Sequence, residues 1–183
     1  RERMMAPVKG LQDTLFQEMK SRIKEDDSTV PAKEDSFWYY RRYEEGKEYP
    51  IYCRKKGSLE APEEILLDVN EIAKCKEFCD VRGFKTSPDH QIISYAVDFV
   101  GRRKYTLRFK PVEGAYLEDQ IPDMTGNFVW ANDNQTVFYC KQHPETLRWE
   151  KIFKHTLGET EDELVYHETD ETYYSAVGKT LSE

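Results

Sequence analysis

The four histidines are the side chains best suited to acid–base chemistry at neutral pH: His90, His143, His155 and His167. Hydrolysis by a triad would need one of them beside a nucleophile and an orienting carboxylate. The sequence holds no Gly-x-Ser-x-Gly segment that would present such a nucleophile. Each histidine falls in an expected turn or at the end of an expected strand, so we interpret all four as surface side chains. We predict no catalytic residue in this chain.

The cysteines offer the next candidate chemistry, because a thiolate is both a nucleophile and a metal ligand. Cys75 and Cys79 would share one face of a helix over residues 72–79, but no His or Cys pair follows at zinc-finger spacing. The nine glycines are never clustered into a phosphate-binding loop. We therefore predict no metal site and no cofactor. Together with Cys53 and Cys140, these cysteines are interpreted as reduced thiols of a cytoplasmic protein.

Charge and hydropathy argue against two classes of partner. The 183 residues include 35 acidic and 27 basic side chains, a net charge of −8 that argues against a nucleic acid partner. No apolar run approaches the ~20 residues that cross a bilayer, so we expect no membrane segment. The basic runs at 41–42, 54–56 and 102–104 are interpreted as solvated sheet edges. Segment 159–171 holds seven acidic residues and no Lys or Arg, and its alternative role is a negative rim for a cationic peptide.

The elements that would position these residues begin with a helix. Pro7 suits a first helical position, and apolar residues then recur at spacings of three and four. We predict a helical extension over residues 1–26, whose apolar stripe needs a surface to cover, and a polar linker over residues 27–36. The stripe consists of Val8, Leu11, Leu15, Met19 and Ile23.

From Phe37 onward apolar residues alternate with polar ones, which predicts short antiparallel strands. These strands follow an internal repeat of 44 residues, in which Asp89 of one expected turn matches Asp133 of another. A unit of about 40 to 50 residues with four short strands is typical of a β-propeller blade. The same shift superimposes aromatic side chains in three strands: Phe84 on Phe128, Tyr95 on Tyr139 and Phe109 on Phe153.

The repeat predicts a mainly β fold, a partial β-propeller of about three four-stranded antiparallel blades preceded by the N-terminal helix. Within residues 37–183, the expected blades cover approximately 37–70, 83–121 and 127–168, and the start of a next blade covers 172–183. The alternative is a meander of hairpins in a sandwich. Propellers close with about four to eight blades, so we expect this chain to be a fragment of a longer protein.

Particular residues add a family resemblance to this pattern. The run Trp38–Lys56 resembles the first propeller segment of oligopeptidase B, the protease II branch of the prolyl oligopeptidase family. The resemblance spans nearly the whole chain in the expected order. Its further stretches are Leu11–Leu15, Leu66–Glu71, Ser87–Asp89, Tyr105–Lys110 and Val129–Asp133.

The resemblance implies a two-domain cytoplasmic serine peptidase. In that family a C-terminal α/β-hydrolase domain cuts short peptides after Arg or Lys, and a seven-bladed propeller restricts access to it. The catalytic triad lies in the hydrolase domain and has no matching position here. Residues 1–26 match a helical extension that packs on the hydrolase domain, which would cover the apolar stripe. The implied partners are this domain and short basic peptides.

We therefore expect the chain to form part of a lid and size filter over an active site located elsewhere, and to be inactive by itself. The alternative is a stand-alone propeller or sandwich that acts as a scaffold for protein interaction. Apolar faces left exposed on a fragment would also favour self-association.

Overall fold

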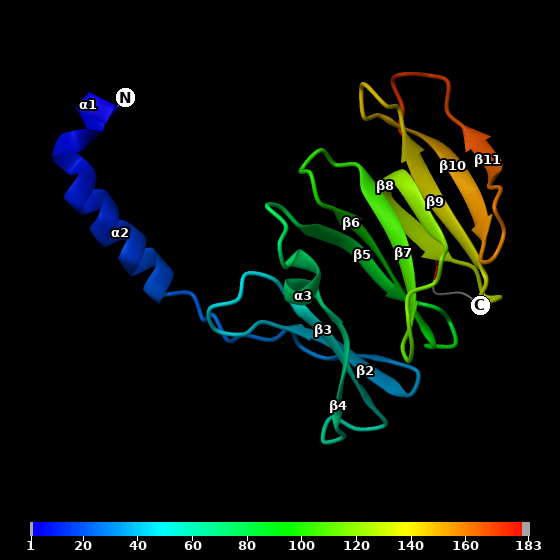
Figure 1. The fold of residues 1–183 in the computed structure, drawn as a ribbon, viewed down its shortest axis with the longest axis horizontal. Coiled ribbons are helices and arrows are strands. Elements are labelled where there is room, and N and C mark those ends of the chain that lie inside the picture. The colour runs from blue at the N-terminus through cyan, green and yellow to red at the C-terminus, as the bar shows by residue number, and fades with distance from the viewer. Residues whose placement is uncertain (1, 181–183) are drawn as a thin grey trace. The chain divides into compact units, whose positions relative to one another are not determined.

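The computed structural model describes residues 2–180, which form two compact units that divide after Glu71. The first unit holds the N-terminal helices and a four-stranded sheet, and the second holds a seven-stranded sheet (Figure 1). The fold is mainly β with a helix at the N-terminus, as predicted. Residue 1 of the expected extension and residues 181–183 of the expected next blade lie outside the described residues. None of the helices in the described part is long and apolar enough to cross a membrane.

The N-terminal helix contains α1 (Glu2–Met5), a 3-10 turn (Ala6–Val8) and α2 (Lys9–Ser21). Pro7 lies in the turn that opens α2, where its missing N–H costs no helical hydrogen bond. No residue of α2 is buried, and Ile23, the last residue of the apolar stripe, is 67% exposed. The stripe therefore has no covering surface among the described residues.

The first sheet contains four antiparallel strands in chain order, and α3 (Val69–Ala73) follows it. Part of the segment predicted as a linker, residues 27–36, is a strand, because β1 pairs with β2 and Ser28 forms a bridge to Arg42. Strand pairing uses backbone groups, so this polar segment needs no apolar side chain to join the sheet. The strands are β1 (Ala32–Glu34), β2 (Phe37–Arg42), β3 (Ile51–Lys56) and β4 (Glu63–Asp68).

The second sheet has the order β11-β10-β9-β8-β7-β6-β5, with every neighbouring pair antiparallel. Strand β8 changes partner at Met124, which pairs with Tyr105 of β7 and with Lys141 of β9. Two four-stranded groups, β5–β8 and β8–β11, therefore share one strand. The strands are β5 (Asp80–Thr86), β6 (Ile92–Asp98), β7 (Tyr105–Pro111), β8 (Gln120–Trp130), β9 (Thr136–Gln142), β10 (Trp149–Thr156) and β11 (Glu163–His167).

The 44-residue repeat is visible in the strand register. Lys85 pairs with Ser94 across β5 and β6, and 44 residues later Val129 pairs with Phe138 across β8 and β9. The turns also match. The Asp89 carboxylate accepts a hydrogen bond from the backbone N–H of Gln91, and 44 residues later the Asp133 carboxylate accepts one from the backbone N–H of Gln135. The alignment of Tyr95 with Tyr139 follows this register, whereas Phe84, expected to match Phe128, lies in the irregular stretch between Arg82 and Lys85, where β5 and β6 shift register.

The predicted match of Phe109 with Phe153 is wrong by one residue. Ser94 pairs with Phe109, whereas its equivalent in the second group, Phe138, pairs with Lys154. The cause is a bulge in β10, where Glu150 is inserted between two residues that pair with consecutive residues of β9. An extra residue in one strand shifts every later pair and reverses the face that each side chain occupies.

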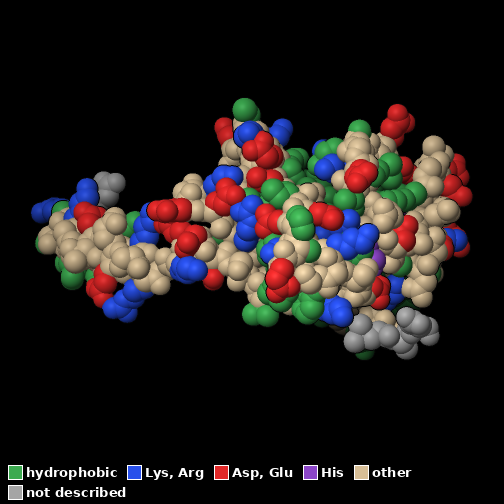
Figure 2. Space-filling view, turned by 90° about the horizontal axis from the view of Figure 1, so that it is seen from below, with side chains coloured by type: hydrophobic (Ala, Val, Ile, Leu, Met, Phe, Trp, Pro, Cys, Tyr) green, Lys and Arg blue, Asp and Glu red, His purple; other side chains and the backbone are tan. Residues whose placement is uncertain are grey.

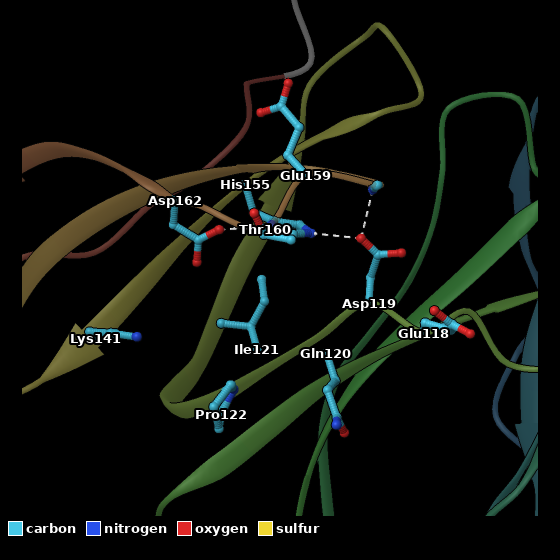
Figure 3. Close-up of a pocket in the computed structure, with 11 residues that line it drawn as sticks. Glu118, Asp119, Gln120, Ile121, Pro122, Lys141, His155, Glu159, Thr160 and Asp162 are labelled. Carbon is cyan, nitrogen blue, oxygen red and sulfur yellow. Dashed lines mark hydrogen bonds and ion pairs between the residues drawn. The ribbon is translucent and has the colours of Figure 1, made fainter.

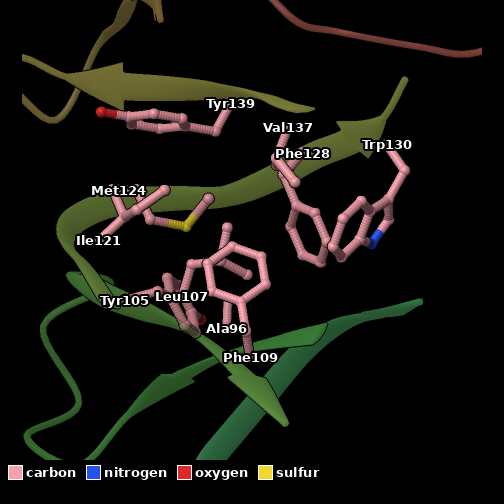
Figure 4. Packing of buried hydrophobic residues seen from close by; sticks show 10 residues of the cluster. All are labelled: Ala96, Tyr105, Leu107, Phe109, Ile121, Met124, Phe128, Trp130, Val137 and Tyr139. Carbon is pink, nitrogen blue, oxygen red and sulfur yellow. The ribbon is translucent and has the colours of Figure 1, made fainter. Parts of the chain in front are cut away.

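The main core lies between the two four-stranded groups (Figure 4). Side chains from β6 and β7 meet side chains from β8 and β9, and the Phe109 ring packs edge-on against Trp130 at a centroid distance of 5.7 Å. The Trp130 indole N–H donates to Ser94 Oγ at 2.8 Å, so the buried polar group is satisfied. The cluster consists of Ala96, Tyr105, Leu107, Phe109, Ile121, Met124, Phe128, Trp130, Val137 and Tyr139.

Residues 172–180, expected to open a further blade, contain no strand. The Val177 backbone is held on both sides by one side chain, because its N–H donates to Asn127 Oδ1 and its carbonyl accepts from Asn127 Nδ2. A strand pairs with the backbone of a neighbouring strand. At Val177 the side chain of Asn127 bonds both backbone groups instead, so no strand pairing forms there.

Candidate functional site

The second unit contains a polar cavity of about 470 Å³ (Figure 3). Its walls come from residues 118–122 at the start of β8, from Lys141 of β9, from His155 of β10, and from residues 158–160 and Asp162 between β10 and β11. Four carboxylates line it, and two of them flank the histidine. The lining acidic residues are Glu118, Asp119, Glu159 and Asp162.

His155 is the central side chain of this cavity and is 5% exposed. Its Nδ1 lies 2.7 Å from Asp162 Oδ1, and its Nε2 lies 3.3 Å from Asp119 Oδ1. The Phe109 ring stacks on the imidazole, with an interplanar angle of 19°, and connects it to the core. The prediction of a surface position for His155 is wrong, because β10 directs the ring inward between the carboxylates of Asp119, 36 residues earlier, and Asp162, seven residues later.

The two carboxylates are themselves held by further donors. Asp119 Oδ1 accepts the Gly158 backbone N–H at 2.7 Å, which fixes the loop after β10 to the start of β8. Asp162 accepts the hydroxyl of Tyr139 from β9. Burial, together with this bond to a carboxylate, raises the pKa of the Tyr139 phenol far above its usual range. The cluster therefore joins β8, β9, β10 and the loop before β11.

The arrangement does not form a hydrolytic triad. Both imidazole nitrogens of His155 face carboxylates, so neither is free to take a proton from a nucleophile. Among the lining residues the described structure offers no Ser or Cys, and Thr160 is the one with a hydroxyl. The geometry instead suits a structural hydrogen-bond cluster that holds the loop after β10 against the start of β8. The sequence gives no local sign of it, because Asp119 is 36 residues from His155.

The other histidines occupy different environments. His90 is buried in the turn before β6, with a positive φ of 61°, so its predicted surface position is also wrong. His143 Nδ1 accepts backbone N–H groups of the hairpin after β9 and stabilises that turn. His167 is exposed at the end of β11. None of these three histidines lines the cavity around His155.

The cysteines form no disulfide, and within residues 2–180 no group of three or more His, Cys, Asp or Glu side chains is arranged to hold a metal. Cys75 is exposed and Cys79 is buried. Burial raises the pKa of the Cys53 thiol to about 12 and that of Cys140 to about 11. Both buried thiols are therefore protonated and unreactive at neutral pH.

Arg42 and Arg54 belong to the basic runs, but they are not solvated side chains at a sheet edge. Arg54 is 5% exposed, lies 4.1 Å over the Phe37 ring, and donates to Glu64 at 2.7 Å. Arg42 donates to Glu63 of β4 and also to Glu44. The Arg54 pair joins neighbouring strands β3 and β4, and the Arg42–Glu63 pair reaches from β2 across β3 to β4, so both arginines support the fold and are not free to bind an anion.

The architecture defines the class of protein. Antiparallel four-stranded groups repeat along the chain and pack face to face over an aromatic core, which is the plan of a β-propeller domain. The family model described as "Prolyl oligopeptidase, N-terminal beta-propeller domain" matches residues 1–183. The chain belongs to this family, the propeller domain of the prolyl oligopeptidase family of serine peptidases.

Individual relatives agree with this assignment. Dipeptidyl aminopeptidase BI of Pseudoxanthomonas mexicana is 38% identical over 97% of this chain, and Protease 2 of Moraxella lacunata is 29% identical over 98%. The chain spans 27% of each of these two proteins. The structure of oligopeptidase B from Leishmania major is 34% identical with a TM-score of 0.85, and that from Trypanosoma brucei is 30% identical with a TM-score of 0.82. Each of these matches covers 92% of this chain and 24% of the solved chain.

Proposed function

We propose that this chain is the N-terminal part of the propeller of an oligopeptidase B-like serine peptidase that hydrolyses short peptides after Arg or Lys. In this proposal the chain forms part of the lid and size filter, and the catalytic triad belongs to a C-terminal α/β-hydrolase domain of the same protein. A rigid ring over a cavity admits a flexible peptide and rejects a folded domain. A filter of this kind needs no reactive side chain.

The likeness to the two oligopeptidase B structures carries the proposal. Both structures are at least 30% identical to this chain and have TM-scores above 0.8 over 92% of it. The matched region covers only 24% of each solved chain. The engaged nitrogens of His155 agree with a supporting role for this part. The exposed stripe of α2 provides a surface on which the hydrolase domain would dock.

We further propose that the protein acts in the cytoplasm. Four free cysteines, of which Cys75 is exposed, suit a reducing compartment. Fractionation of cells with an antibody against the chain tests this. Recovery in a secreted or periplasmic fraction would contradict it.

A second candidate is an aminopeptidase that removes dipeptides from a free N-terminus. The observation in its favour is the 38% identity to a protein named dipeptidyl aminopeptidase BI. The two candidates differ in what the active site demands of the substrate. An endopeptidase cleaves a peptide whose N-terminus is blocked, and a dipeptidyl aminopeptidase does not.

The test compares the intact protein with the 183-residue chain on matched fluorogenic substrates. We expect the intact protein to cleave an N-terminally blocked substrate after Arg or Lys, and not its Glu or Leu counterpart. We expect no turnover by the 183-residue chain. Cleavage that requires a free N-terminus would favour the aminopeptidase. Turnover by the chain alone, after removal of contaminating proteases, would refute the proposal.

A further inference from the structure

The outer edge of β11 is open. This strand ends the order of the second sheet and pairs only with β10. All five of its residues are exposed, and Leu164, Val165 and Tyr166 are each about half exposed. In the described part of the chain, no backbone hydrogen bond is made to β11 residues from the side away from β10. An edge of this kind is a template for a further strand.

Strand β11 lacks the Lys and Pro residues that usually block such an edge, and its one irregularity is a bulge at Val165 in its pairing with β10. Natural edge strands carry Lys, Pro or inward-pointing charges, or they are very short. Strand β1, at the edge of the first sheet, has three residues and carries Lys33. Strand β5, at the opposite edge of the second sheet, carries Arg82 and Lys85. Strand β11 has five residues, with three consecutive apolar or aromatic side chains and no Lys, Arg or Pro.

The charge around this edge is strongly negative. Residues 159–171 contain seven acidic residues and no Lys or Arg. Acidic side chains appear in red at the right-hand end of the space-filling view, the end at which Figure 1 places β11 (Figure 2). Glu163 pairs with Lys154 of β10, at 3.2 Å. The carboxylates of Glu159, Glu161 and Glu171 make no ion pair or hydrogen bond within residues 2–180.

We propose that the β11 edge binds an extended Lys- and Arg-rich peptide segment by strand addition. Main-chain hydrogen bonds to β11 would supply the pairing, its exposed apolar side chains would contact alternate residues of the segment, and the unpaired glutamates would attract the basic ones. A second copy of this chain is a poor occupant, because two such acidic edges would repel each other. The proposal rests on β11 and its flanking segments alone, so it extends the proposed function and does not depend on it.

The test uses an end-capped peptide of alternating Lys and Val, labelled with a fluorophore. The intact protein is first inactivated with a serine-reactive fluorophosphonate, so that any peptidase activity does not consume the probe. Fluorescence anisotropy measures binding, and amide hydrogen exchange locates it. We expect binding that weakens with salt, together with slower exchange in residues 163–167 and little change elsewhere.

Matched variants distinguish binding at the β11 edge from non-specific attraction to the negative charge of the protein. Glu159→Gln with Glu161→Gln should weaken binding about threefold to tenfold, as the loss of two exposed ion pairs predicts. Glu113→Gln with Glu145→Gln makes the same charge change at exposed turns and should leave the affinity unchanged. A probe with alternate amides N-methylated keeps its charge but lacks strand hydrogen bonds, and it should not bind.

Three results would overturn the proposal. The first is equal binding of the N-methylated probe, which would show attraction without strand pairing. The second is slower exchange outside residues 163–167, which would place the contact elsewhere. The third is an equal effect of the two double variants. Because each measurement reports binding to inactivated protein, failure here would leave the peptidase proposal standing, and loss of peptidase activity would leave this one standing.

Discussion

Replacement of Gly83 by alanine should destabilise the second unit strongly. Gly83 lies in β5 with a φ of +63°, in the left-handed region that a side chain disfavours. A Cβ atom there would lie 2.7 Å from Cε1 of Phe128 and 2.8 Å from the carbonyl oxygen of Gly126. The first neighbour is a buried ring of the core and the second is backbone, so neither can move away cheaply.

The magnitude follows from two separate costs. The left-handed conformation costs an alanine about 1–2 kcal/mol. Overpacking against a filled core adds about 1–3 kcal/mol. The free energy of unfolding should therefore fall by about 2–5 kcal/mol in Gly83→Ala. Gly158→Ala is the matched control, because Gly158 has a φ of +87° with no atom within 4 Å of the added Cβ, so it should lose only the first amount.

Urea unfolding followed by tryptophan fluorescence measures both variants, since buried Trp130 reports on the same core. The midpoint should drop further for Gly83→Ala than for Gly158→Ala, with an unchanged slope. The expected gap between the two variants is about 1–3 kcal/mol. Equal losses would refute the close approach of β5 to β8 on which the reasoning depends.

Three further outcomes follow from buried groups and turns. Tyr139→Phe should lower the free energy of unfolding by about 1–3 kcal/mol in urea melts, because Asp162 loses a buried hydrogen-bond donor. Iodoacetamide at neutral pH should label exposed Cys75 before Cys140, as mass spectrometry of peptides will detect, because burial raises the pKa of the Cys140 thiol to about 11. Hydrogen bonds from a hydroxyl and from backbone N–H groups lower the pKa of Asp133, so its stabilisation is present above the unfolded pKa of about 4 and lost as the pH falls below it. As the pH falls, the free energy of unfolding of Asp133→Asn should therefore decrease less than that of the parent protein.

Each of these outcomes has an internal control. Tyr166→Phe also removes a hydroxyl that donates to a carboxylate, at 2.7 Å, but on the exposed strand β11, and its effect should be much smaller. Prior unfolding in urea should equalise the labelling of Cys75 and Cys140. Asp123→Asn removes an equal charge outside the Asp133 turn, and its acid melt should follow the parent curve. If Tyr139→Phe and Tyr166→Phe lowered the free energy of unfolding by the same amount, the role given to burial would be contradicted.

Several features of this protein are determined by its sequence. The apolar stripe and Pro7 predict the N-terminal helix, and the structure confirms it. The 44-residue repeat predicts two strand groups with the same register, because the spacing of aromatic residues and of turn aspartates is preserved along the chain. These signals are local, since each depends on backbone geometry over one helix or one hairpin.

The sequence alone did not reveal the exceptions to the repeat. Glu150 looks like any other strand residue, yet it is the bulge that turns the expected match of Phe109 with Phe153 into one with Lys154. A bulge forms where packing favours an extra residue, and the strand propensities of the two copies do not differ enough to show it. Strand β1 was missed for a related reason, because a polar segment pairs through its backbone.

The cavity around His155 is the feature that only the tertiary structure decided. Its carboxylates, Asp119 and Asp162, lie 36 and 7 residues from the histidine, in segments that the sequence marks as polar loops. Whether a side chain at the end of a strand faces water or a partner depends on the register of that strand, and in β10 the bulge sets the register. The sequence specifies the elements through short-range geometry, and the long-range pairing of charges emerges only when these elements pack.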